Sequence, residues 1–187
     1  MRPQKVNDEE LMEKMLPLVR KRGYVGTSLN ELAAVTGLKK ASLYHRFPGG
    51  KEEIIHAMLR NVSAWVKENI IEVLKEENNR PEKRLKAAIK NIATFYDNGK
   101  SPCLLRSLSM ETGEDLFVKE LNAGMERWIE AFMKLGSDLG LPENEARDRA
   151  TETLVLIQGS LVVSQTLKNT QPFKQALVKI EKMYTLK

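Results

Sequence analysis

Apolar residues recur at intervals of three and four positions through almost the whole of the 187-residue chain. This spacing makes one face of an α-helix apolar, whereas a half-buried strand requires strict alternation of apolar and polar residues. Nowhere does the sequence alternate cleanly in β-branched residues between turn signals. We therefore predict an all-α protein.

Capping and stop residues divide this periodic sequence into separate helices. Ser28 with Glu31 has the spacing of a capping box, which is a specific helix start, and Gly37 permits a sharp turn after that helix. Pro17 is expected to kink the first helix because it removes one backbone hydrogen bond. Leu32 and Val35 are expected to face the core. The predicted helices are residues 8–22, 29–36, 39–46, 51–77, 81–97, 102–110, 115–139, a helix that begins in "GLPENEA" and ends near 168, and 172–184.

These helices suggest two domains. The first fifty residues are too few to bury a large core of their own. We predict a three-helix module at residues 1–50 that contains a helix-turn-helix, joined rigidly by the long helix 51–77 to an α-helical body within residues 51–187. The turn "TGLK" between the second and third helices fits this motif, because a small side chain at Ala33 lets the two helices cross closely.

Composition narrows the classes of function. Residues 1–60 hold eleven Lys or Arg and seven Asp or Glu, so a net +4 of the total +5 lies in the first third of the chain. A local basic excess is typical of proteins that bind polyanions. The single cysteine, Cys103, excludes an intrachain disulfide, and no apolar run reaches eighteen residues. We expect a cytoplasmic protein without a membrane segment, metal or cofactor.

The stretch "GLKKASLYHRF", residues 37–47, combines an apolar face with a basic, polar one. At 100° per residue, Leu43 and Phe47 share a face, which we assign to the core. Ala41, Ser42 and His45 point away from it, and such a small polar face can enter the DNA major groove. Two interpretations of the cluster remain open, a DNA-contacting helix and a solvated basic surface.

Lys39 lies where an N-cap or first-turn residue belongs. A cation there opposes the helix dipole and cannot cap the helix. A neighbouring DNA phosphate would offset this cost, and the alternative is a tolerated surface lysine. The hydroxyl of Tyr44 suits a phosphate oxygen, although the ring also suits an ordinary half-buried position.

The segment "GYVGTSLNELAAVTGLKKASLYHRFPGGKEEI", residues 23–54, resembles the DNA-binding region of the tetracycline-repressor (TetR) family. The shared features are a Gly-aromatic step, a Thr-Ser pair, a Leu-Ala stretch, a turn glycine, Leu-Tyr-x-x-Phe and Lys-Glu. The resemblance covers roughly residues 8–60, and the chain is similar to the LmrA/YxaF-like subgroup linked to drug-efflux genes. Lys39, Pro17 and "PGGK" depart from the family pattern.

The resemblance implies a homodimeric transcriptional regulator, usually a repressor, that leaves a double-stranded DNA operator when its body binds a small-molecule effector. Carried over by position, it predicts DNA contacts at Thr27, Ser28, Lys40, Ala41, Ser42, Tyr44, His45 and Lys51. Lys39 is added to this set by its place at the start of the helix.

The body carries the two other predicted sites. The helix that ends near 168 is apolar nearly all round, which indicates burial on both sides. One side is expected to face the body's own core, and the other a partner subunit in a four-helix interface with the last helix; burial within one large monomer is the alternative. The predicted interface residues are Val155, Gly159, Val162, Val163 and Thr166. The predicted effector pocket comprises Phe95, Arg106, Met110, Phe117, Trp128 and Gln158, all of which also suit ordinary core or surface positions.

Two other functions compete with this one. A DNA-binding protein without an effector would have a fully packed body. An enzyme that uses Cys103 is disfavoured, since both histidines, His45 and His56, lie far along the chain from it, and the sequence has no phosphate-binding loop or nucleophile elbow.

Overall fold

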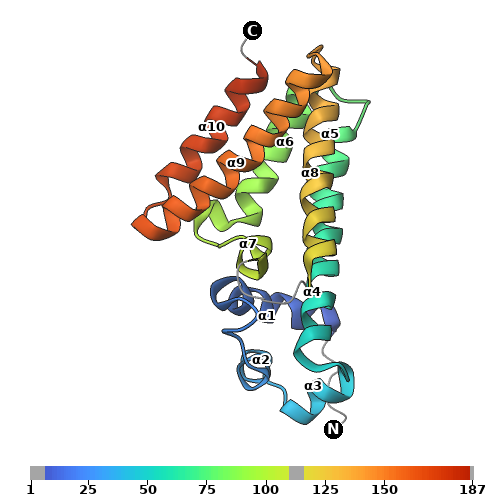
Figure 1. Cartoon of the computed structure of the whole chain (residues 1–187), viewed down its shortest axis with the longest axis vertical. Coiled ribbons are helices and arrows are strands. Elements are labelled where there is room, and N and C mark those ends of the chain that lie inside the picture. Colours follow the sequence, from blue (N-terminus) through green and yellow to red (C-terminus); the bar gives the residue numbers. More distant parts are fainter. Residues whose placement is uncertain (1–6, 110–115, 186–187) are drawn as a thin grey trace. The chain divides into compact units, whose positions relative to one another are not determined.

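Helices are the only regular elements in the computed structural model, which describes residues 7–109 and 116–185 (Figure 1). The prediction of an all-α chain is therefore confirmed. None of the helices in the described ranges is long and apolar enough to span a membrane. The elements are α1 (Asp8–Arg22), α2 (Leu29–Thr36), α3 (Lys40–Arg46), α4 (Gly50–Val66), η1 (Lys67–Ile71), α5 (Glu72–Lys75), α6 (Pro81–Phe95), η2 (Asp97–Gly99), α7 (Leu104–Ser109), α8 (Val118–Asp138), α9 (Glu143–Leu167) and α10 (Gln171–Thr185).

The helix expected at 51–77 is interrupted by a wider turn. After α4 the backbone forms a π-helix, η1, and the run ends with α5 at Lys75. A π-turn disturbs the regular i→i−4 bonding, so its carbonyl groups need other partners. Two amide side chains supply them: Asn69 Nδ2 donates to the Trp65 carbonyl at 3.0 Å, and Asn91 Nδ2 donates to the Asn69 carbonyl at 2.6 Å. Sequence periodicity missed this turn because it leaves the apolar face nearly continuous.

The chain folds into two compact units. Unit 1 comprises residues 1–63 and 104–118, and unit 2 comprises 64–103 and 119–187, so the division falls within α4. The grouping of α7 with α1 was not expected from the sequence. It is made by packing and by Ser107 Oγ, which donates to the Arg20 carbonyl at 2.7 Å. A functional division near residue 50 stays a prediction.

Unit 1 has a continuous apolar core beneath its first helices. Its members include Leu11, Met15, Val19, Leu32, Leu43, Ile54, Ile55 and Met58, all with no exposed surface. Val35 is 42% exposed, so its expected core position is wrong. The buried residues of α2 are instead Leu32, Ala33 and Thr36.

Unit 2 is held by apolar packing and by an ion pair whose arginine is buried. Arg84 of α6 is 4% exposed and donates to the Leu74 carbonyl at 2.9 Å and to Asp138 Oδ2 at 2.8 Å. Burial favours a raised pKa for Asp138, but hydrogen bonds and charges from Lys134 and Arg84 outweigh it and lower the pKa below its ordinary 3.8. The ion pair ties α6 to α8, and the hydrogen bond to the Leu74 carbonyl ties α6 to α5.

Replacing Asp138 by Asn should lower the free energy of unfolding by about 2 kcal/mol at pH 7. This lies below the roughly 3–5 kcal/mol of a fully buried pair, because Asp138 is partly exposed and Asn keeps one acceptor. A lowered pKa stabilises the fold at pH values above 3.8. The difference between wild type and variant should therefore stay constant well above that pH. It should shrink as the pH falls below 3.8 and through the lower pKa of Asp138 in the folded protein.

Urea unfolding at several pH values measures this difference. Glu10→Gln, which breaks the exposed Glu10–Lys14 pair, is the control and should cost less than about 1 kcal/mol. If Asp138→Asn lowers the free energy of unfolding by no more than the control does, a structural role for the Arg84–Asp138 pair is contradicted.

Candidate nucleic-acid interface

The start of α2 is defined by a reciprocal capping box. The Glu31 backbone N–H donates to Ser28 Oγ at 3.3 Å, and the Ser28 backbone N–H donates to Glu31 Oε2 at 2.9 Å. The same carboxylate pairs with Arg22 at the end of α1. The Ser28 backbone hydrogen bond, followed by the Ser28 hydroxyl and the Arg22 charge, lowers the pKa of Glu31. The predicted capping box is confirmed, and it joins α2 to α1.

A left-handed glycine makes the turn from α2 to α3. Gly37 has φ 70° and ψ 13°, a conformation that costs other residues energy because of their Cβ atom. The backbone N–H groups of Gly37 and Leu38 donate to the carbonyls of Ala34 and Ala33 at 3.3 and 3.1 Å. This closed turn brings the chain directly into α3, as the sequence predicted.

The seven-residue helix α3 has a buried face and an exposed face. Leu43 has no exposed surface and Phe47, just after the helix, is 6% exposed. Ala41, Ser42 and His45 are exposed. These three residues, here called the contact face, stand outward because Leu43 and Phe47 anchor the opposite side. The predicted division of α3 into two faces is confirmed.

Lys39 occupies the N-cap of α3 and makes no capping hydrogen bond through its side chain. The expectation that it cannot cap the helix is confirmed. Both Lys39 and Lys40 are exposed beside the positive end of the helix. Lys40 Nζ lies 5.9 Å from the centre of the Tyr44 ring, and Tyr44 is 45% exposed. Cations and a phenol therefore flank the contact face.

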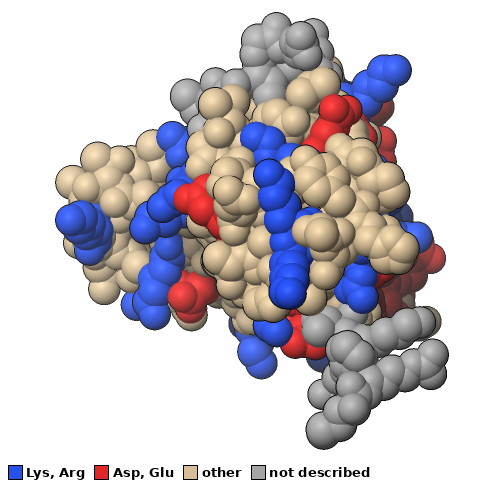
Figure 2. All heavy atoms as spheres, turned by 90° about the horizontal axis from the view of Figure 1, so that it is seen from below, with Lys and Arg blue, Asp and Glu red and all other residues tan. Residues whose placement is uncertain are grey.

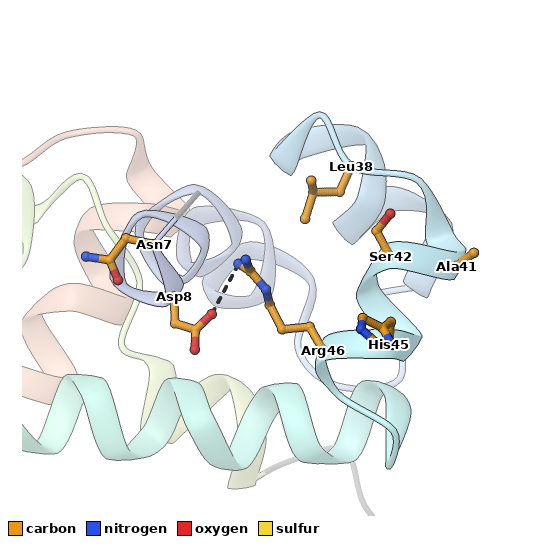
Figure 3. A pocket seen from close by; sticks show the side chains of 7 residues that line it. All are labelled: Asn7, Asp8, Leu38, Ala41, Ser42, His45 and Arg46. Carbon is orange, nitrogen blue, oxygen red and sulfur yellow. Dashed lines mark ion pairs between the residues drawn. The ribbon is translucent and has the colours of Figure 1, made fainter. Parts of the chain in front are cut away.

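The contact face borders an open hollow of about 790 Å³ (Figure 3). On its far side lies the beginning of α1, where the Asn7 side chain accepts from the Glu9 backbone N–H at 3.1 Å. Arg46 Nη1 is paired with Asp8 Oδ1 at 3.1 Å across the hollow. Its lining residues are Asn7, Asp8, Leu38, Ala41, Ser42, His45 and Arg46.

Three of the predicted DNA contacts have structural partners within unit 1. Thr27 is 1% exposed and its hydroxyl donates to the Gly23 carbonyl at 2.7 Å, which contradicts a direct side-chain contact. Lys51 Nζ donates to the Tyr24 carbonyl at 2.8 Å and lies 4.1 Å from the centre of the Tyr24 ring. Ser28 is exposed, but its hydroxyl belongs to the capping box. These residues hold the segment between α1 and α2 in place.

The molecular surface seen from the side of α2 and α3 is rich in basic side chains (Figure 2). Lys and Arg cover more of this face than Asp and Glu, which appear as smaller patches. A surface of this kind attracts a polyanion and raises its local concentration.

The predicted effector residues are divided between the two units. Phe117 and Arg106 belong to unit 1, whereas Phe95, Trp128 and Gln158 belong to unit 2. Phe117 is 1% exposed and packs edge-on against Tyr24 at 5.3 Å and His56 at 5.0 Å, between ring centres, so it is a core residue of unit 1. Its place in an effector pocket stays a prediction. Met110 lies outside the described residues.

The three candidates in unit 2 have mixed surroundings. The Phe95 ring stacks on Trp65, with centres 4.9 Å apart, and the Trp128 ring stacks on Phe132 at 6.4 Å. Gln158 Oε1 is buried without a hydrogen-bond partner among the described residues. A buried carbonyl oxygen without a partner is costly, so it marks a place where a donor is missing.

Helix α9 has the two apolar faces that its sequence predicted. Leu154, Ile157 and Leu161 are buried, with at most 8% exposure. On the other side, Val155 and Val163 are 63% and 44% exposed. Gly159 and Thr166 are also exposed on this second side, and Val162 is half-buried.

The sequence missed Asp8 and Arg46 as neighbours of the contact face. Arg46 follows Ser42 by four positions, which is the spacing of one helix face, so that part of the signal was present. Asp8 lies 38 positions away, and nothing local connects the two. Within the described residues, no cluster of three or more His, Cys, Asp or Glu side chains is placed to bind a metal ion.

Comparison with known proteins supports a shared architecture. Residues 16–58 match the family model "Bacterial regulatory proteins, tetR family", and residues 81–178 match "Transcriptional regulator LmrA/YxaF-like, C-terminal domain". The chain is 23% identical to the HTH-type transcriptional regulator LmrA of Bacillus subtilis over 168 residues, which cover 88% of this chain and 89% of that protein.

Solved structures show the same fold. A TetR transcriptional regulator from Legionella pneumophila superposes with a TM-score of 0.82 at 16% identity, covering 97% of this chain and 98% of that one. A cysteine mutant of the TetR-family regulator CifR, complexed with 26-bp double-strand operator DNA, has a TM-score of 0.75 at 20% identity, with 99% of each chain covered.

Replacing Lys39 by Ser should raise the free energy of unfolding by about 1 kcal/mol, because Ser caps α3 where Lys cannot. Urea unfolding measures the change. Lys40→Ser is the matched control: it removes the same charge one position later, inside the helix, where a hydroxyl gains no capping bond. Equal effects of the two substitutions would mean that charge removal, and not capping, sets the stability of α3.

Proposed function

The chain belongs to the TetR family of bacterial transcriptional regulators, which bind DNA through a helix-turn-helix, and we propose that it is a dimeric repressor of a palindromic operator. The observation that carries this proposal is the contact face of α3, which is exposed, small and flanked by Lys39, Lys40 and Tyr44. We assign DNA binding to residues 1–50, and effector binding and dimerisation to 51–187.

We assign different tasks to the residues around α3. The contact face meets base edges in the major groove, where His45 and Ser42 offer hydrogen-bonding groups and Ala41 an apolar contact. Lys39, Lys40 and Tyr44 meet phosphate oxygens, which fixes the position of the protein on DNA without reading its sequence. The cost of Lys39 at the N-cap is then offset by a phosphate.

Dimerisation is assigned to the second apolar face of α9 together with α10. The two helices pack against each other within unit 2, and Val178 of α10 is 54% exposed. Exposed valines on adjoining helices are favourable to bury against a partner. Gly159 supports this assignment, because a Cβ built there meets no atom within 4 Å and a partner helix can approach closely.

Effector binding is assigned to unit 2, and Gln158 supports it. Its buried Oε1 accepts no hydrogen bond from the described residues, so a small apolar molecule carrying a hydroxyl or amine group would complete it. We propose that such a molecule releases the protein from DNA. A DNA-binding role without an effector is the alternative, and it requires a body with no place for a ligand.

No observation favours the enzyme hypothesis. Cys103 is 4% exposed, and its sulfur lies 3.7 Å from the Tyr96 hydroxyl. The relatives of the chain are regulators of transcription. We place the protein in the cytoplasm, where a bacterial operator lies, and we assign it no metal or cofactor.

Selection of bound duplexes from a random pool tests the proposed function. The expected product is a palindrome whose half-sites match the two subunits of a dimer. Affinity for it should fall with salt, with a slope of about −0.9 per neutralised phosphate on logarithmic axes. Recovery of no common sequence would overturn sequence-specific binding. The selected operator is then the probe for release by small apolar compounds.

The division of tasks is tested on the selected operator and on one with a single changed base pair. His45→Ala should remove about 1 kcal/mol of the discrimination between them. Lys40→Ala should weaken both complexes by the same factor, since it contacts phosphate. Lys40 is preferred to Lys51 here because the ammonium of Lys51 already has internal partners. Equal loss of discrimination in both variants would contradict the assignment.

The proposed dimer face is tested by sedimentation equilibrium. Val163→Glu should convert dimers to monomers, because it places an unpaired charge in an apolar interface. Val25→Glu is the matched control, since Val25 is an exposed valine outside this face, at 67% exposure. If Val163→Glu leaves the dimer intact, the interface does not lie on this face of α9.

A further inference from the structure

The Arg46–Asp8 pair joins the last residue of α3 to the first residue of α1. The Arg46 side chain points toward Asp8 and away from His45, which precedes it on the same helix (Figure 3). The side chains of Arg46 and Asp8 are 29% and 69% exposed. Both residues line the hollow next to the contact face.

Arg46 is well placed to reach a nucleic acid lying on the contact face. It follows Ser42 by four residues, so the two lie on one side of α3, and both line the same hollow. A guanidinium presents a planar fork of donors that matches a phosphate as well as a carboxylate. A DNA backbone passing over the hollow would therefore offer Arg46 a second acceptor of the same kind as Asp8.

The ion pair is of the kind that exchanges easily. A partly exposed pair is worth little, because water screens it and two long side chains lose freedom to form it. Asp8 also repels a phosphate by its own charge. Its helix gives it a second use, since acidic side chains in the first turn of α1 favour the helix dipole. Asp8 thus lowers DNA affinity while it supports α1.

We propose that Arg46 is a further DNA-contacting residue and that Asp8 holds it in the free protein. On binding, the guanidinium exchanges the Asp8 carboxylate for a DNA phosphate. This inference rests on the proposed DNA-binding function and assigns to it a pair of residues outside the family-based set. Asp8 then competes with the operator phosphate for Arg46. The strength of the Asp8–Arg46 ion pair therefore affects the affinity of the protein for its operator.

The test measures affinity and salt dependence on the selected operator for Asp8→Asn, Arg46→Gln and the double variant. Asp8→Asn should tighten binding about five-fold without changing the salt slope, because Arg46 meets the phosphate in both proteins. Arg46→Gln should weaken binding and reduce the slope by about 0.9, the value of one phosphate contact. Circular dichroism of each variant checks that the helices remain folded.

Glu9→Gln is the matched control for Asp8→Asn. Glu9 is exposed, like Asp8, and lies in the same first turn of α1. The substitution therefore removes the same charge without breaking the Asp8–Arg46 pair. It should tighten binding less than two-fold. In an Arg46→Gln background, Asp8→Asn should have no more effect than Glu9→Gln, because the competition has been removed.

Two outcomes overturn the inference while leaving the proposed function intact. One is equal tightening by Asp8→Asn and Glu9→Gln with Arg46 present, which would reduce Asp8 to a general repulsive charge. The other is an unchanged salt slope in Arg46→Gln, which would mean that Arg46 meets no phosphate. Failure of the wild-type protein to select any operator would instead overturn the proposed function itself.

Discussion

The candidate interface depends on the burial of Leu43 and Phe47 beneath α3. A helix of seven residues is too short to persist in water alone, since helices shorter than about 12–15 residues are marginal even in favourable sequences. The left-handed turn at Gly37 and the burial of these two apolar side chains stabilise α3 despite its short length. Because they bind one side of α3 to the core of unit 1, the opposite side is presented to solvent in a defined orientation.

Polar groups around α3 are divided between holding the fold and remaining available. Thr27, the Ser28 hydroxyl and the Lys51 ammonium are satisfied within unit 1, so they position α2 and its neighbours. Lys39 and Lys40 are exposed next to an uncapped helix start. The arrangement gives up local stability at the N-cap and gains positive charge where a polyanion would lie. A DNA-binding helix benefits from this positive charge, whereas a helix with only a structural role would lose stability without any gain.

Unit 2 also contains side chains that hold the fold and side chains that remain available for binding. Helix α9 buries one apolar face within the unit and exposes valines on the other, which is the face that we propose for a partner subunit. The buried Arg84 side chain fixes how α6 meets α5 and α8. The partnerless Gln158 oxygen is the opposite case, a buried polar group that the described part of the chain leaves incomplete.

Local rules in the sequence determined the helices, the capping box at Ser28, the turn at Gly37 and the two faces of α3 and α9. Each depends on residues a few positions apart, whose periodicity and backbone preferences can be read directly. Tertiary packing alone decided that Val35 is exposed, that Thr27 and Phe117 are buried, and that Asp8 meets Arg46. These outcomes depend on residues distant in the chain, and a short-range pattern contains no information about which of them come together in space.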